Sequence, residues 1–207
     1  MKLSAILALA AAHGVAAAPA KGVEARAQVD GAAPHVDDPK FIGIVMDAHW
    51  FWRKVHCAQD LVWNATLAQE ALESVSVCTH GLQHDRGGSN LSGVGPSPGN
   101  YDAWIEFARN SIHGWHEEER LYPYSQPHYN DAWGHFSQMV WRDSSQIGCA
   151  LGHCKDSGDG AVQWPGRIYC FYLRAGNNFA GNQFELNVFR PVCAPPSRQE
   201  MERRYGY

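Results

Sequence analysis

Apolar side chains recur every three or four positions in three segments of the first part of the chain, as on the buried face of a helix. The first segment, about 39–57, is opened by Asp37-Asp38-Pro39, since acids and a proline suit a first helical turn. The second follows Asn64, a plausible helix cap, and the third spans 100–118. Their buried stripes are Phe41, Ile44, Val45, Ala48 and Trp52; Leu67, Ala71, Val75 and Cys78; and Trp104, Ala108, Ile112 and Trp115.

Later in the chain, one short helix precedes a set of alternating segments. Phe136, Met139 and Val140 are spaced as in a short buried helix over 134–141, with His135 at its start, where a side chain can face a cleft. Apolar and polar residues alternate, as in strands, at about 146–153, 167–173 and 182–189. The stretches 79–100 and 120–133 lack a period and are predicted to be loops. This order of elements indicates an α+β fold with an antiparallel sheet.

The two ends of the chain do not follow these patterns. Residues 1–17 have the features of a secretory signal, with Lys2 as the positive end and an apolar run, Leu3 to Ala12, too short to span a membrane. We expect a flexible leader over 18–36, one domain over 37–193 and a disordered tail over 194–207. No later apolar run reaches spanning length, so we expect no membrane span in the mature chain.

Composition narrows the class of protein. The chain has 207 residues with 45% hydrophobic side chains, enough for one domain with a real core and too apolar for a disordered protein. The formal net charge is −4, which argues against a nucleic-acid partner because such binding needs a basic face.

The six cysteines, in a chain expected to be secreted, predict disulfides. Six cysteines allow fifteen pairings, and spacing alone does not choose among them. Secretion also makes Asn64-Ala65-Thr66 a candidate glycosylation site. A second sequon, at Asn90-Leu91-Ser92, we expect to be unused.

Two motifs resemble a known family. Gly-His-Phe-Ser-Gln-Met-Val-Trp at 134–141, followed by Ile-Gly-Cys-Ala at 147–150, is similar to the first signature of the CAP superfamily of cysteine-rich secretory, antigen five and pathogenesis-related class-one proteins. Cys170 to Asn177 resembles the second signature, although Phe171 stands where a small polar residue is usual. The resemblance covers roughly residues 40–193 and implies a three-layer helix–sheet–helix sandwich. The style of the signal peptide and the overall pattern resemble those of fungal members.

The resemblance also implies a disulfide pattern and a polar cleft. It pairs Cys78 with Cys149 and Cys154 with Cys170, which leaves Cys57 for Cys193. The family's cleft usually holds two histidines and two glutamates, and three of these carry over, as His84, Glu118 and His135, while Ser89 replaces the other glutamate.

The residues of this cleft are compatible with two interpretations. Two imidazoles and a carboxylate can bind a divalent metal such as zinc, with affinity weakened by Ser89; alternatively, the same side chains form a hydrogen-bonded cluster that braces the loops. We assign no catalytic residue, because a Ser89–His84 nucleophile and base would lack both an acid to orient the histidine and an oxyanion hole.

The aromatic stretch 121–133 is the second candidate site. Tyr122, Tyr124 and Tyr129 have the spacing of a segment that is implicated in sterol binding in similar secreted fungal proteins. Tyrosine rings offer an apolar face with a polar tip that suits a sterol hydroxyl, but the same rings also stabilise ordinary loops by packing. The resemblance also implies, for some relatives, a separate groove for fatty acids between the first and fourth helices.

Together these features predict a secreted CAP-domain protein that binds a sterol or other lipid outside the cell, with lipid export or host interaction as its role. Two alternatives belong to other classes. One is a metal-dependent hydrolase that uses His84, Glu118 and His135, and the other is an interaction module that binds a host or cell-wall protein.

Overall fold

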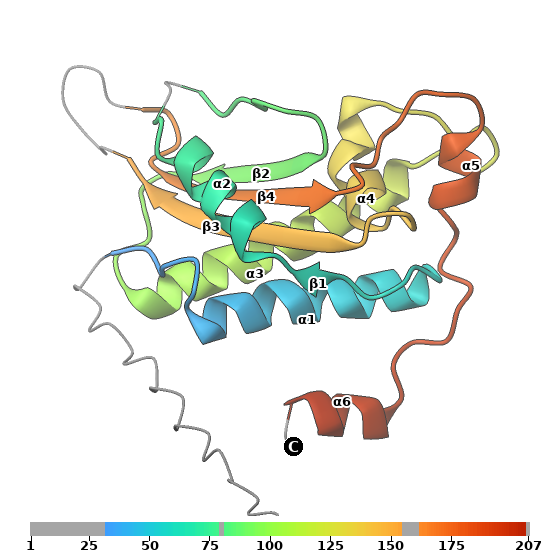
Figure 1. Cartoon of the computed structure of the whole chain (residues 1–207), viewed down its shortest axis with the longest axis horizontal. Coiled ribbons are helices and arrows are strands. Elements are labelled where there is room, and N and C mark those ends of the chain that lie inside the picture. Colours follow the sequence, from blue (N-terminus) through green and yellow to red (C-terminus); the bar gives the residue numbers. More distant parts are fainter. Residues whose placement is uncertain (1–31, 79–80, 155–161, 206–207) are drawn as a thin grey trace, which may run out of the picture.

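The computed structural model describes residues 32–78, 81–154 and 162–205 as a sheet between two layers of helices (Figure 1). The predicted signal over 1–17 and most of the predicted leader lie outside these residues. Helix α2 (Ala65–Val75) covers one face of the sheet, and α1 (Pro39–Val55), α3 (Tyr101–Glu117) and α4 (Gly134–Met139) lie on the other. The predicted helix–sheet–helix sandwich is confirmed.

The three long helices begin at the residues that the sequence predicts. The Asp38 side chain accepts a hydrogen bond from the Phe41 amide at 2.9 Å and so caps α1. Asn64 caps α2 by accepting from the amides of Thr66 and Leu67, and Asn100 caps α3. Glycosylation of Asn64 stays a prediction.

The sheet is mixed, which corrects the prediction of a purely antiparallel one. Its strand order is β1 (Val62–Trp63), β3 (Gln146–His153), β4 (Gly166–Leu173) and β2 (Ser89–Val94). β1 runs parallel to β3, whereas the β3–β4 and β4–β2 pairs are antiparallel. In the chain, β1 lies between α1 and α2, and no hairpin joins it to β3. The direction of this two-residue strand relative to β3 is therefore not fixed by a tight turn.

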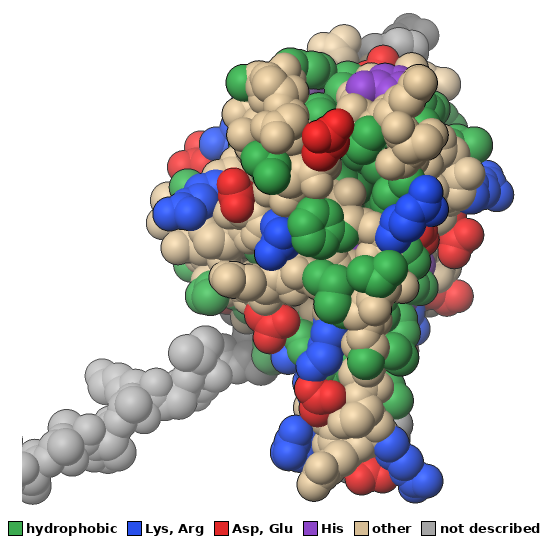
Figure 2. All heavy atoms as spheres, turned by 90° about the vertical axis from the view of Figure 1, so that its right-hand side faces the viewer, with side chains coloured by type: hydrophobic (Ala, Val, Ile, Leu, Met, Phe, Trp, Pro, Cys, Tyr) green, Lys and Arg blue, Asp and Glu red, His purple; other side chains and the backbone are tan. Residues whose placement is uncertain are grey.

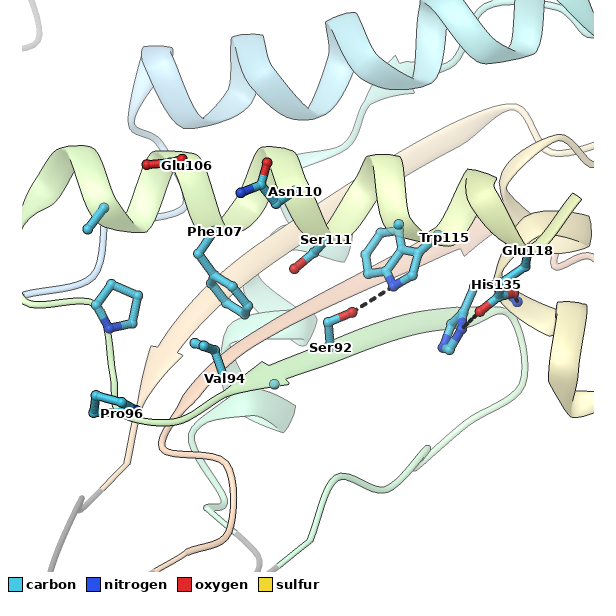
Figure 3. Close-up of a pocket in the computed structure, with 14 residues that line it drawn as sticks. Ser92, Val94, Pro96, Glu106, Phe107, Asn110, Ser111, Trp115, Glu118 and His135 are labelled. Carbon is cyan, nitrogen blue, oxygen red and sulfur yellow. Dashed lines mark hydrogen bonds and ion pairs between the residues drawn. The ribbon is translucent and has the colours of Figure 1, made fainter. Parts of the chain in front are cut away.

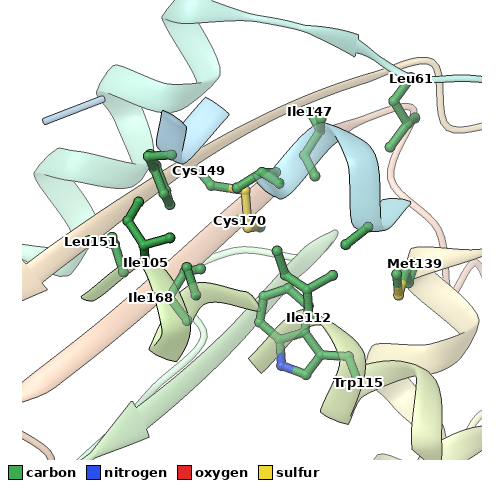
Figure 4. Packing of buried hydrophobic residues seen from close by; sticks show 14 of the residues in the cluster. Leu61, Ile105, Ile112, Trp115, Met139, Ile147, Cys149, Leu151, Ile168 and Cys170 are labelled. Atoms are coloured by element: carbon green, nitrogen blue, oxygen red, sulfur yellow. A yellow bond between two sulfur atoms is a disulfide. The ribbon is translucent and has the colours of Figure 1, made fainter. Parts of the chain in front are cut away.

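Both central strands are buried on both faces, because helices cover the sheet on each side. One face joins the main core with α1, α3 and α4 (Figure 4), and the other packs under α2. The main-core residues of β3 and β4 are Ile147, Cys149, Leu151, Ile168, Cys170 and Tyr172; those under α2 are Ala150, Tyr169 and Phe171.

Glycines on β3 let α2 approach the sheet closely. A Cβ atom at Gly148 would lie 2.2 Å from the Ala68 amide nitrogen, and one at Gly152 would lie 2.7 Å from Val75. Only hydrogen fits at these two positions, so the distance between α2 and the sheet depends on them.

Strand β2 corrects the prediction that 79–100 forms only a loop. Its sequence, Ser-Asn-Leu-Ser-Gly-Val, has low strand propensity. It is nevertheless paired with β4 over its whole length, from Ser89 opposite Phe171 to Val94 opposite Gly166. Pairing with a buried strand outweighs local propensity here.

The predicted strand at 182–189 is wrong, because residues Gln183–Asn187 form the short helix α5. Phe184 and Val188 are four residues apart and are both buried, whereas Leu186 between them is half exposed. The apolar residues at 184, 186 and 188 also fit a strand, in which all three would be buried on one face. The exposure of Leu186, which the sequence does not show, distinguishes the helix from the strand.

The prediction of a disordered tail over 194–207 is also wrong for the residues of helix α6 (Arg198–Tyr205). Lys54 forms an ion pair with Glu200, Arg204 pairs with Asp47 at 2.5 Å, and the Arg204 guanidinium lies over the Trp50 ring. Figure 2 views the molecule from the right-hand side of Figure 1 and shows acidic and basic side chains interspersed on that face.

The disulfides agree with one of the three predicted pairings. Cys57 is bonded to Cys193 as predicted. The other two bridges are Cys149–Cys170 and Cys78–Cys154, so both pairings that the resemblance implied are wrong. Cys149 and Cys170 lie directly opposite each other on β3 and β4, and cysteines in that register are close enough to bond.

A buried arginine joins α1 to the segment after α4. Arg53 has no exposed surface and donates to four backbone carbonyls, those of Gln59, Met139, Trp141 and Ser144, at 2.8–3.0 Å. Burial lowers the pKa of Arg53 to about 10, which leaves it charged at neutral pH. Removing it would leave buried carbonyls without donors.

Candidate functional site

A groove of about 670 Å³ runs between α3 and β2 and ends at His135 (Figure 3). Phe107, Ser111 and Trp115 point from α3 toward β2, whereas Glu106 and Asn110 do not. The apolar side chains along the groove are Val94, Pro96, Pro98, Ala103, Phe107 and Trp115.

The Trp115 indole donates a hydrogen bond to the Ser92 hydroxyl at 2.8 Å across the groove. This bond joins α3 to β2 and fixes one part of the floor.

At the end of the groove, Glu118 holds His135 in place. The 2.7 Å contact joins His135 Nδ1 to Glu118 Oε1, and because a carboxylate oxygen accepts, the ring nitrogen donates. Glu118 Oε2 accepts from the backbone amides of His135 and Phe136. These are the first free N–H groups of α4, so one carboxylate caps the helix and orients the imidazole.

The His135 Nε2 atom is consequently a lone-pair acceptor. It is buried and has no hydrogen-bond partner among the residues that the structure describes. A buried acceptor without a partner costs free energy, which a donor placed there would recover.

His84 is oriented in a similar way by Ser89. The hydroxyl of Ser89 donates to the Arg86 carbonyl at 3.0 Å, so His84 Nδ1, 2.7 Å from Ser89 Oγ, is the donor in that contact. Burial, and next the nearby His135, lowers the pKa of His84. Since the Ser89 proton is directed to a carbonyl, this pair is not arranged as a nucleophile and base.

The predicted trio is brought together but is not arranged as a three-ligand metal site. The His84 and His135 rings stack with centroids 6.1 Å apart. Both Glu118 oxygens already accept hydrogen bonds from residues 135 and 136. Zinc sites that keep an open position use three protein ligands, and here two imidazoles are left. The residues do not fit such a site, and we derive no reaction step through a metal in the cleft.

A second hollow, of about 660 Å³, lies next to His135. His84, Ser89, Tyr129 and Phe179 are among the residues that line it. His135 lines both this hollow and the groove.

The three tyrosines of the predicted lipid site do not share one exposed face. Tyr122 is only 5% exposed and packs in a cluster with Phe136. The Tyr124 hydroxyl donates to Glu119 at 2.9 Å. Tyr129 lines the second hollow, packs edge-on against Phe179 and donates to Asp131. Of the three, Tyr129 lines the second hollow.

Sequence reasoning missed the walls of the groove. Phe107 and Gly114 lie seven positions apart on α3, beside the stripe of core residues, and this second stripe faces β2. The spacing of these residues along α3 is visible in the sequence, but the strand that this stripe faces, β2, is not predicted from it.

A sequence profile described as the cysteine-rich secretory protein family matches residues 46–172. Protein PRY2 of Saccharomyces cerevisiae is 34% identical over 61% of this chain and 35% of its own length. The secreted protein RBT4 of Candida albicans is 32% identical over 69% of this chain and 37% of its own. The chain therefore spans about a third of the length of these two relatives.

Solved structures share the fold at low sequence identity. The crystal structure of Na-ASP-1 superposes with a TM-score of 0.57 at 18% identity, covering 82% of this chain and 47% of that one. Within the residues described here, no helix is both long and apolar enough to cross a membrane.

Proposed function

The chain belongs to the cysteine-rich secretory protein family, and from that premise we propose that it is a secreted protein that binds a sterol or another elongated lipid in the groove between α3 and β2. Secretion is supported by relatives that are named as secreted proteins and by the three disulfides, which are typical of oxidising compartments.

The observation that carries the proposal is an apolar groove that ends in a polar group. Phe107, Trp115 and Val94 line its length, and the His135 ring stands at its end. The volume of about 670 Å³ lies within the range of sites for small molecules. A sterol has the matching shape, an apolar body with a hydroxyl group at one end, and that hydroxyl could donate to the unpartnered His135 Nε2 once the ring turns and exposes this buried atom.

The tyrosines of the predicted lipid site have different roles in this proposal. Tyr129 could contact a ligand that extends past His135 into the second hollow, because it lines that cavity. Tyr122 would have to leave its cluster first, so we assign its ring to packing in the free protein.

Direct binding of a fluorescent sterol and, separately, of a fluorescent fatty acid to the purified secreted protein tests the proposal. Gly114 lies in the groove wall, and an added Cβ there meets nothing within 4 Å, so Gly114→Leu places a large apolar side chain at the groove and leaves the core unchanged. We expect its affinity for the lipid that binds to fall at least tenfold.

Gly43→Leu is the matched control, because Gly43 is also a helical glycine with open space around it and is not part of the groove. It should bind as the wild type does. If neither lipid binds, or if Gly114→Leu binds as tightly as the wild type, the proposal is wrong. Changing Tyr122, Tyr124 and Tyr129 together to alanine separately tests the aromatic segment.

A further inference from the structure

A second set of possible metal ligands lies where the carboxyl ends of α1 and α3 meet. His56 follows the last turn of α1, His116 lies in the last turn of α3, and Glu119 lies in the short 3-10 helix η1 (Glu118–Leu121). Within the residues that the structure describes, they form the one group of three or more histidine, cysteine or acidic side chains whose ligand atoms all lie within 4.8 Å of one another.

We propose that His56, His116 and Glu119 bind a divalent transition-metal cation of the zinc class, at a site separate from the cleft. The His56 and His116 Nε2 atoms are 3.0 Å apart, and Glu119 Oε2 lies 3.6 Å from the His116 Nε2 and 3.9 Å from the His56 Nε2.

These distances are close to those of a zinc site. With ligands about 2.0–2.1 Å from a tetrahedral zinc ion, neighbouring ligand atoms stand about 3.3 Å apart. Each of the three observed separations comes within about 0.6 Å of that value, so small side-chain shifts would complete the geometry. Three protein ligands leave the fourth position for water.

The outer hydrogen bonds of two ligands already have the arrangement that metal sites use. His56 Nδ1 lies 2.6 Å from the Phe189 carbonyl oxygen, which can only accept, so Nδ1 carries the proton and Nε2 presents its lone pair to His116. The remaining oxygen of Glu119, Oε1, accepts from the Tyr124 hydroxyl at 2.9 Å. Such second contacts fix the orientation of metal ligands.

The local electrostatics also favour a cation. Two helix C-termini converge here, and each carries a partial negative charge. Burial lowers the pKa of both histidines, that of His116 to about 3, so both rings are neutral at physiological pH and free to act as ligands.

The competing explanation is a hydrogen bond between the two histidines, with one proton shared by the facing Nε2 atoms. That bond gives no role to Glu119 Oε2, which lies beyond hydrogen-bond distance of both ring nitrogens. A cation between the three atoms would use all of them.

Calorimetric titration of the chelator-treated full-length protein with zinc chloride tests the site. We expect stoichiometric binding, and Glu119→Gln, which keeps an acceptor for Tyr124, should lower the affinity at least tenfold. Glu117→Gln changes an exposed neighbour outside the cluster and should have no effect. His135→Gln removes a cleft histidine and should leave this site intact.

Imidazole nitrogen NMR gives a second readout that does not depend on a variant folding. Added zinc should shift the Nε2 resonances of His56 and His116, whereas that of His49, which is bonded to Tyr172, should stay in place. If the His56 and His116 signals are unchanged at saturating zinc, or if only His135→Gln loses binding, the pair is a simple hydrogen bond and the proposal is overturned.

Discussion

His49 has no exposed surface, and both of its ring nitrogens are hydrogen-bonded. Nδ1 lies 2.7 Å from the Val45 carbonyl and is the donor, so Nε2 accepts from the Tyr172 hydroxyl at 2.8 Å. Burial is the main reason that the pKa of His49 is lowered from 6.5 to about 3. The folded protein therefore requires the neutral ring.

This pKa predicts loss of stability in acid. Between pH 6.5 and about 3 the unfolded chain binds a proton on residue 49 that the folded protein does not, so the free energy of unfolding falls as the pH falls. For His49 alone the slope is about 1.4 kcal/mol per pH unit. Urea unfolding of the wild type and of His49→Gln at several pH values in this range measures it.

Other histidines with lowered pKa values contribute to both curves, so the difference in slope isolates residue 49. Parallel curves would contradict the prediction, because they would show that His49 binds a proton as readily in the folded protein as in the unfolded chain.

At the residue scale, the sequence predicts which side chains meet but not what each does. The family resemblance placed Glu118 and His135 in one cleft, and the structure shows their side chains hydrogen-bonded to each other. The resemblance could not show that two backbone amides and the His135 ring would occupy both oxygens of the Glu118 carboxylate, because this depends on how η1 ends relative to the start of α4.

At the scale of elements, periodicity predicted the long helices because each has a continuous buried stripe and a capping side chain. Periodicity failed to predict β2 and α5. β2 exists because β4 pairs with it, and α5 is too short for period two and period four to be distinguished.

Two glycine substitutions should change stability in opposite directions. Gly148→Ala would place a methyl group against the backbone of α2 and should lower the free energy of unfolding by about 1–3 kcal/mol. Gly43→Ala, inside α1 with open space around it, should raise it by about 0.5–1 kcal/mol.

Thermal or urea unfolding of the two variants beside the wild type measures both effects. A Gly148→Ala protein as stable as the wild type would mean that α2 can move away from the sheet at little cost.

At the scale of the whole molecule, the cross-links were the hardest feature to predict. Cys149 and Cys170 pair because β3 and β4 place them in register, and that leaves Cys78 for Cys154. A register is a property of the folded sheet, and sequence spacing does not contain it.

The Cys57–Cys193 bridge should contribute strongly to stability. It spans 136 residues, although the Cys78–Cys154 bridge already shortens the loop that it closes. Replacing Cys57 and Cys193 together by alanine should cost about 4 kcal/mol in the free energy of unfolding, through the entropy of the unfolded chain.

Neither cysteine of this bridge is buried, so the loss would report the cross-link and not a cavity. Urea unfolding under non-reducing conditions measures it. A change below about 1 kcal/mol would mean that the unfolded chain is already compact around these residues.

His135 is a common wall of the groove and the second hollow. A ligand that turns this ring when it binds in one of the two cavities also changes the shape of the other cavity. For such a ligand, binding in one cavity changes the affinity of the other cavity for its own ligand, and this coupling free energy is equal in both directions. A molecule that fills either one can thus act as a competitor, or as a helper, for a molecule that it never touches.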